Sequence, residues 1–211
     1  MQQPSKHSQW LGSQSEVPKG WPAGILYLRA PYYSKKLPEE ALQALTFAKS
    51  DLPASEEALK TGPPYNNVKI TKISDSNHPA NGQYGLFANQ HLLPDSFILP
   101  YVGYVHDKNE TDEASNYDLS LDRDHGIAVD ASRIGNEARF INDYRGVTSS
   151  PNAEFRDVFV DLGNGKVEKR MAIFVLGAGK SRKRAKGIAK GHEILVSYGK
   201  GFWTERMQTE R

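Results

Sequence analysis

Residues 129–142 have the sequence VDASRIGNEARFIN, and they are the most informative stretch of the 211-residue chain. The stretch begins within a short apolar run, residues 127–130, that is typical of a β-strand. A short helical pattern follows over residues 133–140. Helical periodicity is otherwise scarce after residue 64, so this stretch stands apart from the strand-rich region around it.

The region on both sides of this stretch is predicted to form many short strands. Turn signals such as Asn81-Gly82 and Gly163-Asn164-Gly165 separate apolar or alternating runs. The predicted strands are residues 68–73, 85–88, 97–105, 117–121, 127–130, 154–160, 171–176 and 193–198. Because no long crossover helices connect them, we expect a mostly β (α+β) fold of several small sheets.

Residues 1–64 are predicted to form a short helical N-terminal flank that ends at the Gly62-Pro63-Pro64 break. Its clearest element is a helix over residues 38–49, PEEALQALTFAK, with proline and acidic residues in the first turn and an apolar stripe at Leu42, Leu45 and Phe47. A second short helix is predicted over residues 55–60. Residues 65–203 would form the main domain, and residues 204–211 a C-terminal tail.

The composition argues against several classes of protein. The chain has no cysteine, so it has no disulfide and no thiolate metal site. Its six histidines lack metal-binding spacing, and we predict no metal. No apolar run approaches the length of about 18 residues that a membrane span needs, and the N-terminus lacks the apolar core of a signal peptide. A soluble intracellular protein with no membrane partner is expected.

Five segments of the chain, in order, resemble the signature of the SET-domain family of protein-lysine methyltransferases. They are residues 81–88, 99–105, 115–121, 129–142 and 191–199. The run Arg139-Phe140-Ile141-Asn142 matches the family's motif without a gap. The resemblance covers roughly residues 67–203 and implies a SET fold. In that fold, residues 191–199 thread under the Asn142 segment to form a knot-like C-terminal core.

The resemblance implies that a methyl group passes from S-adenosylmethionine to a lysine side chain, leaving S-adenosylhomocysteine. It implies catalytic roles for Tyr198 and Tyr117. The implied cofactor-binding residues are Gln83, Tyr84, Gly85, Arg139, Phe140, Asn142, Asp143 and Tyr198. The implied substrate channel consists of Tyr117, Phe155, Val196, Phe202 and Trp203. Glycine is expected at position 85 because a Cβ would fill space that the cofactor needs.

The sequence also departs from the family's pattern. Gln83 stands where a glycine is usual, and Asp143-Tyr144-Arg145 replaces His-Ser-Cys. These departures leave open an alternative, a catalytically weakened SET module that serves as a chromatin-binding scaffold. Phe155 and Val196 occupy two positions at which relatives narrow the channel with tyrosine, which suggests room for more than one methyl group.

The local distribution of charge suggests a basic peptide substrate and a cellular location for the protein. Residues 107–124 hold seven acidic and two basic residues, a local net charge of −5, which would attract a basic peptide such as a histone tail. A solvated acidic loop is the alternative. Residues 180–186 hold five basic residues. A nuclear-import signal or a nucleosome contact through residues 180–190 is predicted, and a solvated loop is again the alternative. We expect a nuclear protein, with the cytoplasm as the second choice.

Overall fold

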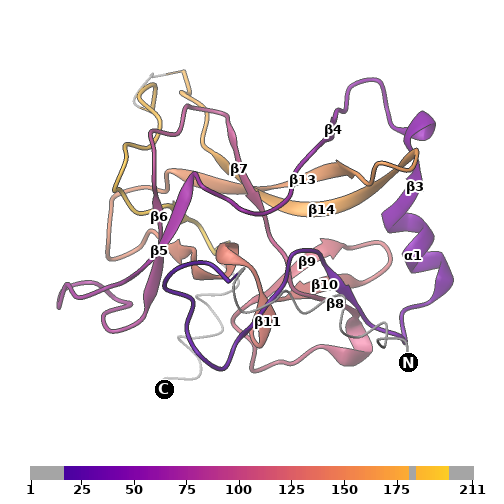
Figure 1. Cartoon of the computed structure of the whole chain (residues 1–211), viewed down its shortest axis with the longest axis horizontal. Coiled ribbons are helices and arrows are strands. Elements are labelled where there is room, and N and C mark those ends of the chain that lie inside the picture. Colours follow the sequence, from indigo (N-terminus) through magenta and orange to yellow (C-terminus); the bar gives the residue numbers. More distant parts are fainter. Residues whose placement is uncertain (1–16, 181–183, 200–211) are drawn as a thin grey trace, which may run out of the picture.

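The computed structural model describes residues 17–180 and 184–199. Over these residues the protein is mostly β, with short strands in five small sheets and one seven-residue α-helix. This confirms the fold class expected from the sequence. Figure 1 shows the long strands β13 and β14 crossing the upper part of the molecule, with α1 at one side and β5 and β6 at the other.

Apart from β13 and β14, the strands are short, and several pair with distant partners. The four-stranded sheet has the order β2 (Tyr32–Tyr33), β8 (Tyr104–Asp107), β10 (Ile127–Asp130) and β9 (Asp118–Asp122). The five-stranded sheet has the order β3 (Thr46–Ala48), β14 (Lys166–Val175), β13 (Ala153–Asp161) and β4 (Ala58–Leu59), with β7 (Phe97–Pro100) also paired to β14. Three two-stranded sheets join β1 (Leu26–Tyr27) to β11 (Ile134–Gly135), β5 (Val68–Lys72) to β6 (Tyr84–Ala88), and β12 (Asn142–Asp143) to β15 (Leu195–Val196). The helical elements are α1 (Glu39–Leu45), η3 (Lys49–Asp51), η4 (Lys108–Glu110) and η5 (Glu137–Phe140).

The described part of the N-terminal flank completes the sheets of the main domain. Strand β1 pairs with β11 and β2 with β8, both in parallel. Strand β3 pairs with β14 in antiparallel orientation, and β4 pairs with β13 in parallel. Every one of these partners lies beyond residue 100, so residues 26–59 are held against the domain by backbone hydrogen bonds.

The helix predicted over residues 38–49 is correct at its start and wrong at its end. It stops at Leu45 because Thr46–Ala48 forms β3, where Phe47 lies opposite Val167. Leu45 is fully buried and Leu42 is exposed, so the apolar stripe is narrower than expected. Pairing with β14 and an edge-to-face contact with Phe159, at 5.6 Å between ring centroids, hold Phe47 in the strand.

The second helix, predicted over residues 55–60, is not present. Ala58 and Leu59 instead form β4 beside Phe159 and Val160 of β13. Leu59 packs against a small apolar cluster that includes Val160. Burial of that side chain on the sheet outweighs the weak helical preference of the segment.

Other predicted elements differ in their bounds. The run over residues 97–105 is two strands, β7 and β8, because the chain turns at Gly103. The run over residues 193–198 contains only the two residues of β15, and the helical pattern over residues 133–140 divides into β11 and η5. No helix among the described residues has the length and apolar composition to cross a bilayer.

Glu137 links the flank to the segment that carries Asn142. It is the first residue of η5 and 4 % exposed, and the hydroxyl of Tyr27 lies 3.3 Å from both of its carboxylate oxygens. Burial raises the pKa of the Glu137 carboxyl above its usual range, and hydrogen bonds from its own backbone N–H and from Tyr27 oppose this only in part. The fold therefore holds a carboxylate that is poorly compensated at neutral pH.

We expect the substitution Glu137→Gln to make the stability less dependent on pH. A carboxyl whose pKa is raised by folding contributes most stability below its unfolded pKa, and this contribution is lost as pH rises through the folded pKa. The Tm of the variant should therefore rise relative to that of the wild type as pH increases from 5 to 8. Thermal unfolding at each pH measures this difference. The exposed Glu56→Gln is the control. A constant difference between Glu137→Gln and wild type across this range would contradict the prediction.

Candidate active site

A cavity of about 320 Å³ lies between β9, β13 and the C-terminal segment. Its aromatic wall comes from residues far apart in the sequence: Tyr101, Tyr117, Phe155 and Tyr198. Two charged side chains, Asp118 and Arg139, also line it. The lining therefore combines an aromatic wall with polar and charged side chains.

Hydrogen bonds and ring contacts hold the aromatic wall together. The hydroxyl of Tyr101 donates to the carbonyl oxygen of Tyr117 at 2.8 Å, and its ring meets Phe155 edge to face at 5.9 Å. Complete burial raises the pKa of Tyr101 well above its usual range, so this hydroxyl stays a donor. The guanidinium of Arg139 lies 4.5 Å from the centre of the Tyr117 ring and donates to the carbonyl oxygens of Ala131 and Ser132.

Tyr198 is fixed at both its backbone and its hydroxyl. Its backbone N–H donates to Oδ2 of Asp143 at 2.7 Å, and its hydroxyl donates to the carbonyl oxygen of Ile141 at 2.6 Å. The hydroxyl hydrogen of Tyr198 is donated to Ile141. The hydroxyl oxygen can therefore act only as an acceptor for a ligand. An acceptor of that kind can attract the polarised C–H groups of a methyl carried on a positive sulfur.

Ile141 and Asn142 face opposite sides of one extended piece of backbone. Ile141 has φ −73° and ψ 130°, and its neighbour begins β12. Successive side chains in extended backbone point in opposite directions. Accordingly, Ile141 lines the aromatic cavity, whereas Asn142 turns away to contact Tyr84 and Glu193. Tyr198 bonds to the backbone between these two sides.

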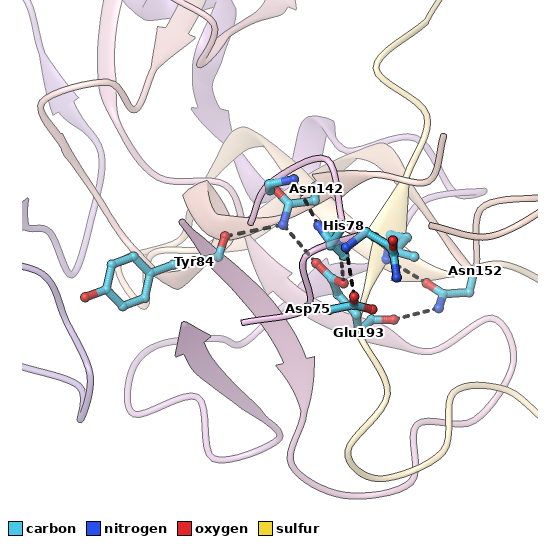
Figure 2. A network of polar contacts seen from close by, with 9 residues as sticks. Asp75, His78, Tyr84, Asn142, Asn152 and Glu193 are labelled. Carbon is cyan, nitrogen blue, oxygen red and sulfur yellow. Dashed lines mark hydrogen bonds and ion pairs between the residues drawn. The ribbon is translucent and has the colours of Figure 1, made fainter. Parts of the chain in front are cut away.

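The side-chain amide of Asn142 has a fixed orientation. Figure 2 shows its Nδ2 donating to the carbonyl oxygen of Tyr84 and to Oε1 of Glu193, at 3.3 Å and 2.8 Å respectively. Both N–H groups are used, and Oδ1 accepts no hydrogen bond from the described residues. This oxygen is therefore able to accept a hydrogen bond from a ligand, and it suits a positively charged amino group.

Gly85 lies next to this amide, where an added Cβ would crowd two side chains. A Cβ built at position 85 would lie 2.6 Å from Oε1 of Glu193 and 2.9 Å from the Phe87 ring. The side chain would therefore displace the carboxylate that orients Asn142. The glycine therefore leaves room for Glu193, and its expected role of leaving room for the cofactor stays a prediction.

Asp143 does not leave an unpaired charge in the site. Its carboxylate accepts hydrogen bonds from the backbone N–H groups of Arg145 and Tyr198, and Arg145 Nη1 lies 2.8 Å from Oδ2. The residue is 7 % exposed, and its own backbone pairs with Val196 in the parallel β12–β15 sheet. The departure Asp143-Tyr144-Arg145 thus forms a structural link that fixes Tyr198.

The residues on the Asn142 side fit the amino-acid part of S-adenosylmethionine. That group carries an ammonium, for which Asn142 Oδ1 is a suitable acceptor. The sequence comparison decides which family this arrangement belongs to: the SET-domain pattern matches residues 83–199, more than half of the chain. The chain belongs to the SET-domain family.

Solved structures similar to this SET-domain protein come from polycomb repressive complex 2. The crystal structure of the Chaetomium thermophilum complex is 25% identical with a TM-score of 0.48, over 66% of this chain and 16% of that chain. The structure "ctPRC2 in an autoinhibited conformation bound to S-adenosylmethionine" is 24% identical with a TM-score of 0.48, over 70% and 17%. This SET-domain chain therefore spans about a sixth of those longer chains. No curated protein matches its sequence.

The structure separates the predicted site residues of the SET domain into two groups. Tyr117, Phe155, Arg139 and Tyr198 line the aromatic cavity. The guanidinium of Arg139 stacks on Tyr117, and the role in cofactor binding expected for Arg139 stays a prediction. The residues near the Asn142 amide are Tyr84, through its carbonyl, and Gly85, through Glu193. Phe140 is buried against Tyr84, with ring centroids 5.8 Å apart, and Gln83 is exposed.

Of the predicted channel residues, Val196 does not line the cavity, and two others lie outside the described residues. Val196 is fully buried and is not among the residues that line it, since its side chain packs in the apolar core. The expectation of room for several methyl groups therefore depends on Phe155 alone. Phe202 and Trp203 lie outside the described residues, as do residues 181–183 of the basic run and the tail over residues 204–211.

Four residues of the site were missed in the sequence: Tyr101, Asp118, His78 and Glu193. Tyr101 and Glu193 lie inside the matched segments, so attention to their hydrogen-bonding groups could have found them. Asp118 follows Tyr117 directly, and only the cavity distinguishes it from the other acids nearby. Within the described ranges 17–180 and 184–199, no group of three or more His, Cys, Asp or Glu side chains could hold a metal ion.

Proposed function

We propose that this protein transfers a methyl group from S-adenosylmethionine to a lysine side chain of a protein, with a histone tail as the substrate. Membership of the SET-domain family supports methyl transfer. The observation that carries the proposal is the arrangement around Tyr198. Its hydroxyl bonds to Ile141, which lines the aromatic cavity, and the next residue, Asn142, presents its acceptor to the other side.

The arrangement suits an in-line displacement, in which most of the catalysis is positioning. When bound, S-adenosylmethionine supplies a methyl group on a positively charged sulfur. Asn142 Oδ1 would hold its ammonium, and Tyr198 would stand beside the reacting carbon with its oxygen as an acceptor. The lysine would approach through the cavity on the Ile141 side.

The cavity also favours the reactive form of the acceptor. A free lysine has a pKa near ~10.4, and only its neutral amine can attack the methyl group. The aromatic walls formed by Tyr101, Tyr117 and Phe155 make the ammonium costly by desolvation. These side chains therefore lower the pKa of a bound lysine without a dedicated strong base.

Asp118 supports a basic substrate. Its Oδ1 is buried and makes no hydrogen bond within the described residues, although Nε2 of His106 lies 3.4 Å away. Burial raises the pKa of this carboxyl, and His106 beside it acts in the opposite direction. Two other acids of the insert have partners away from the cavity: Glu110 accepts from Tyr104, and Asp122 pairs with Lys169. Among the acids of the insert that the structure describes, Asp118 is the one that lines the cavity, so it could meet a cationic residue beside the target lysine.

We expect Asp118→Asn to raise the KM for a basic histone-tail peptide about fivefold, because a desolvated charge pair is lost. The KM for S-adenosylmethionine should stay within about twofold, since Asp118 lies on the cavity side. Steady-state kinetics at pH 8 measure both. Asp124→Asn makes the same charge change at an exposed position of the same insert and is the control. Equal effects of the two variants would show that only the overall field matters.

The proposal is tested by thermal shift followed by a labelling assay. At a concentration a hundred times its Kd, S-adenosylmethionine should raise the Tm by about 5 °C. Incubation with methyl-labelled cofactor and core histones or whole-cell extract should then transfer label to protein lysine. Absence of both effects would favour the scaffold alternative. The hydrogen bond from Tyr198 to Asp143 argues against that alternative, because it holds Tyr198 in position.

A nuclear location and a nucleosome contact through residues 180–190 remain part of the proposal. Within the described portion of this run, Nε of Arg184 donates to the carbonyl oxygen of Gly177. Basic side chains of this kind would contact phosphate groups mainly through charge, so binding to nucleosomal DNA should weaken steeply with salt.

A further inference from the structure

His78 contacts the donor side of the site from a loop that precedes it in the chain. The loop joins β5 to β6, and its Nε2 lies 2.9 Å from Oε2 of Glu193, across 115 positions of sequence. Both side chains are 8 % exposed. Figure 2 shows the imidazole and the Asn142 amide on the two oxygens of one carboxylate.

The hydrogen bonds fix which nitrogen of His78 carries its hydrogen. The backbone N–H of Ala80 donates to Nδ1 at 3.0 Å, so this nitrogen is an acceptor. The hydrogen of the neutral ring is therefore on Nε2, where it is donated to Glu193. A continuous set of bonds runs from Ala80 through His78 and Glu193 to Asn142.

Glu193 has few other means of staying in place. Its Oε1 is bonded to Asn142 and its Oε2 to His78, and its own backbone oxygen accepts from Asn152. A buried carboxylate oxygen that loses its donor costs free energy, so the side chain would rotate to find another. The Asn142 amide would then lose one of its two acceptors and could flip.

We infer that His78 is a positioning residue for S-adenosylmethionine: through Glu193 it holds the Asn142 amide with Oδ1 toward the ammonium of the cofactor. The inference rests on the proposed function. It adds to that function a residue outside the five matched segments and a physical reason for Gly85, whose missing Cβ leaves room for the carboxylate.

The test compares two replacements of the same residue. Glutamine can place an N–H near the position of histidine Nε2, whereas asparagine is too short to reach Glu193. His78→Asn should raise the Kd for S-adenosylhomocysteine, measured by calorimetry, about tenfold, and His78→Gln should stay within about threefold of wild type. The KM for the protein substrate should change less than about twofold in both. His125→Ala, which removes an exposed imidazole paired with Asp122, is the control.

Coupling to Asn142 separates positioning from general destabilisation. In an Asn142→Ala background, His78→Asn should have no further effect on S-adenosylhomocysteine binding, because the group that it orients is absent. Additive losses, or a lowered Tm that accounts for the loss in His78→Asn, would overturn the inference. Equal binding by wild type and His78→Asn would also overturn it and leave the proposed function intact. A wild type that binds no S-adenosylhomocysteine would overturn both.

Discussion

Tyr198→Phe is expected to lower the turnover number about a hundredfold while the Kd for S-adenosylmethionine changes less than about threefold. Removal of one preorganised polar contact to the reacting group typically costs this much. Tyr198 contributes only its hydroxyl oxygen to that group, since the hydrogen is given to Ile141. The backbone of Tyr198 stays bonded to Asp143 in the variant, so the surrounding chain keeps its place.

Single-turnover kinetics and calorimetry give the two quantities separately. Tyr32→Phe is a matched control, because Tyr32 lies on β2 and its ring packs at a tilt against Tyr104, away from the cavity. A parallel loss of turnover and of cofactor affinity in Tyr198→Phe would contradict the role beside the reacting carbon. Such a result would indicate that the hydroxyl of Tyr198 positions the backbone of Ile141 for cofactor binding.

Gly103→Ala is expected to destabilise the protein by about 3 kcal/mol or more. Its Cβ would lie 2.4 Å from the carbonyl oxygen of Asp130 and 3.1 Å from the backbone nitrogen of Ala131. Both atoms belong to the backbone, so no side-chain rotation can relieve the overlap. Residue 103 also accepts a hydrogen bond from Tyr32, which places β2 beside β8. A shift at this point would disturb the four-stranded sheet.

Thermal unfolding measures this effect, and a loss of about 3 kcal/mol corresponds to about 6–12 °C in a protein of this size. Gly177→Ala is the control because a Cβ there meets nothing within 4 Å, and its φ is not positive. An unchanged Tm in Gly103→Ala would show that β8 and β10 can separate slightly without loss of packing. The account of the β7–β8 turn would then be wrong.

The residues of the candidate site could be named from the sequence because they lie in contiguous runs. Asn142 and Tyr198 sit within segments 129–142 and 191–199, and the structure brings them onto the paired strands β12 and β15 or directly beside them. Tyr117 and Phe155, which the sequence analysis assigned to the substrate channel, both line the aromatic cavity, and the identity of that cavity with the channel stays a prediction. In these segments the local sequence motif was enough to identify residues that the fold brings together.

The flank could not be predicted because its strands have two or three residues each. Two residues show no alternation, and strands such as β1 and β4 exist only through partners more than a hundred positions away. The helix over residues 39–45 ends early for the same reason, since pairing with β14 overrides the local preference of Phe47. Tertiary contacts decided these elements.

His78 illustrates the same limit within the site. Its loop is a run of polar residues and turn formers, with no spacing that points to Glu193. The pair becomes visible only when the strands β5 and β6 place the loop beside the C-terminal segment. A single histidine in such a loop would ordinarily be taken as a surface residue, and its burial is what marks it.

The most direct test of the central claim is a crystal structure with S-adenosylhomocysteine bound. The account predicts its amino group on Oδ1 of Asn142 and its sulfur beside the Tyr198 hydroxyl, facing the cavity lined by Tyr117 and Phe155. A ligand bound elsewhere on the surface, or a sulfur separated from that cavity by the backbone of Ile141 with no opening between them, would contradict it.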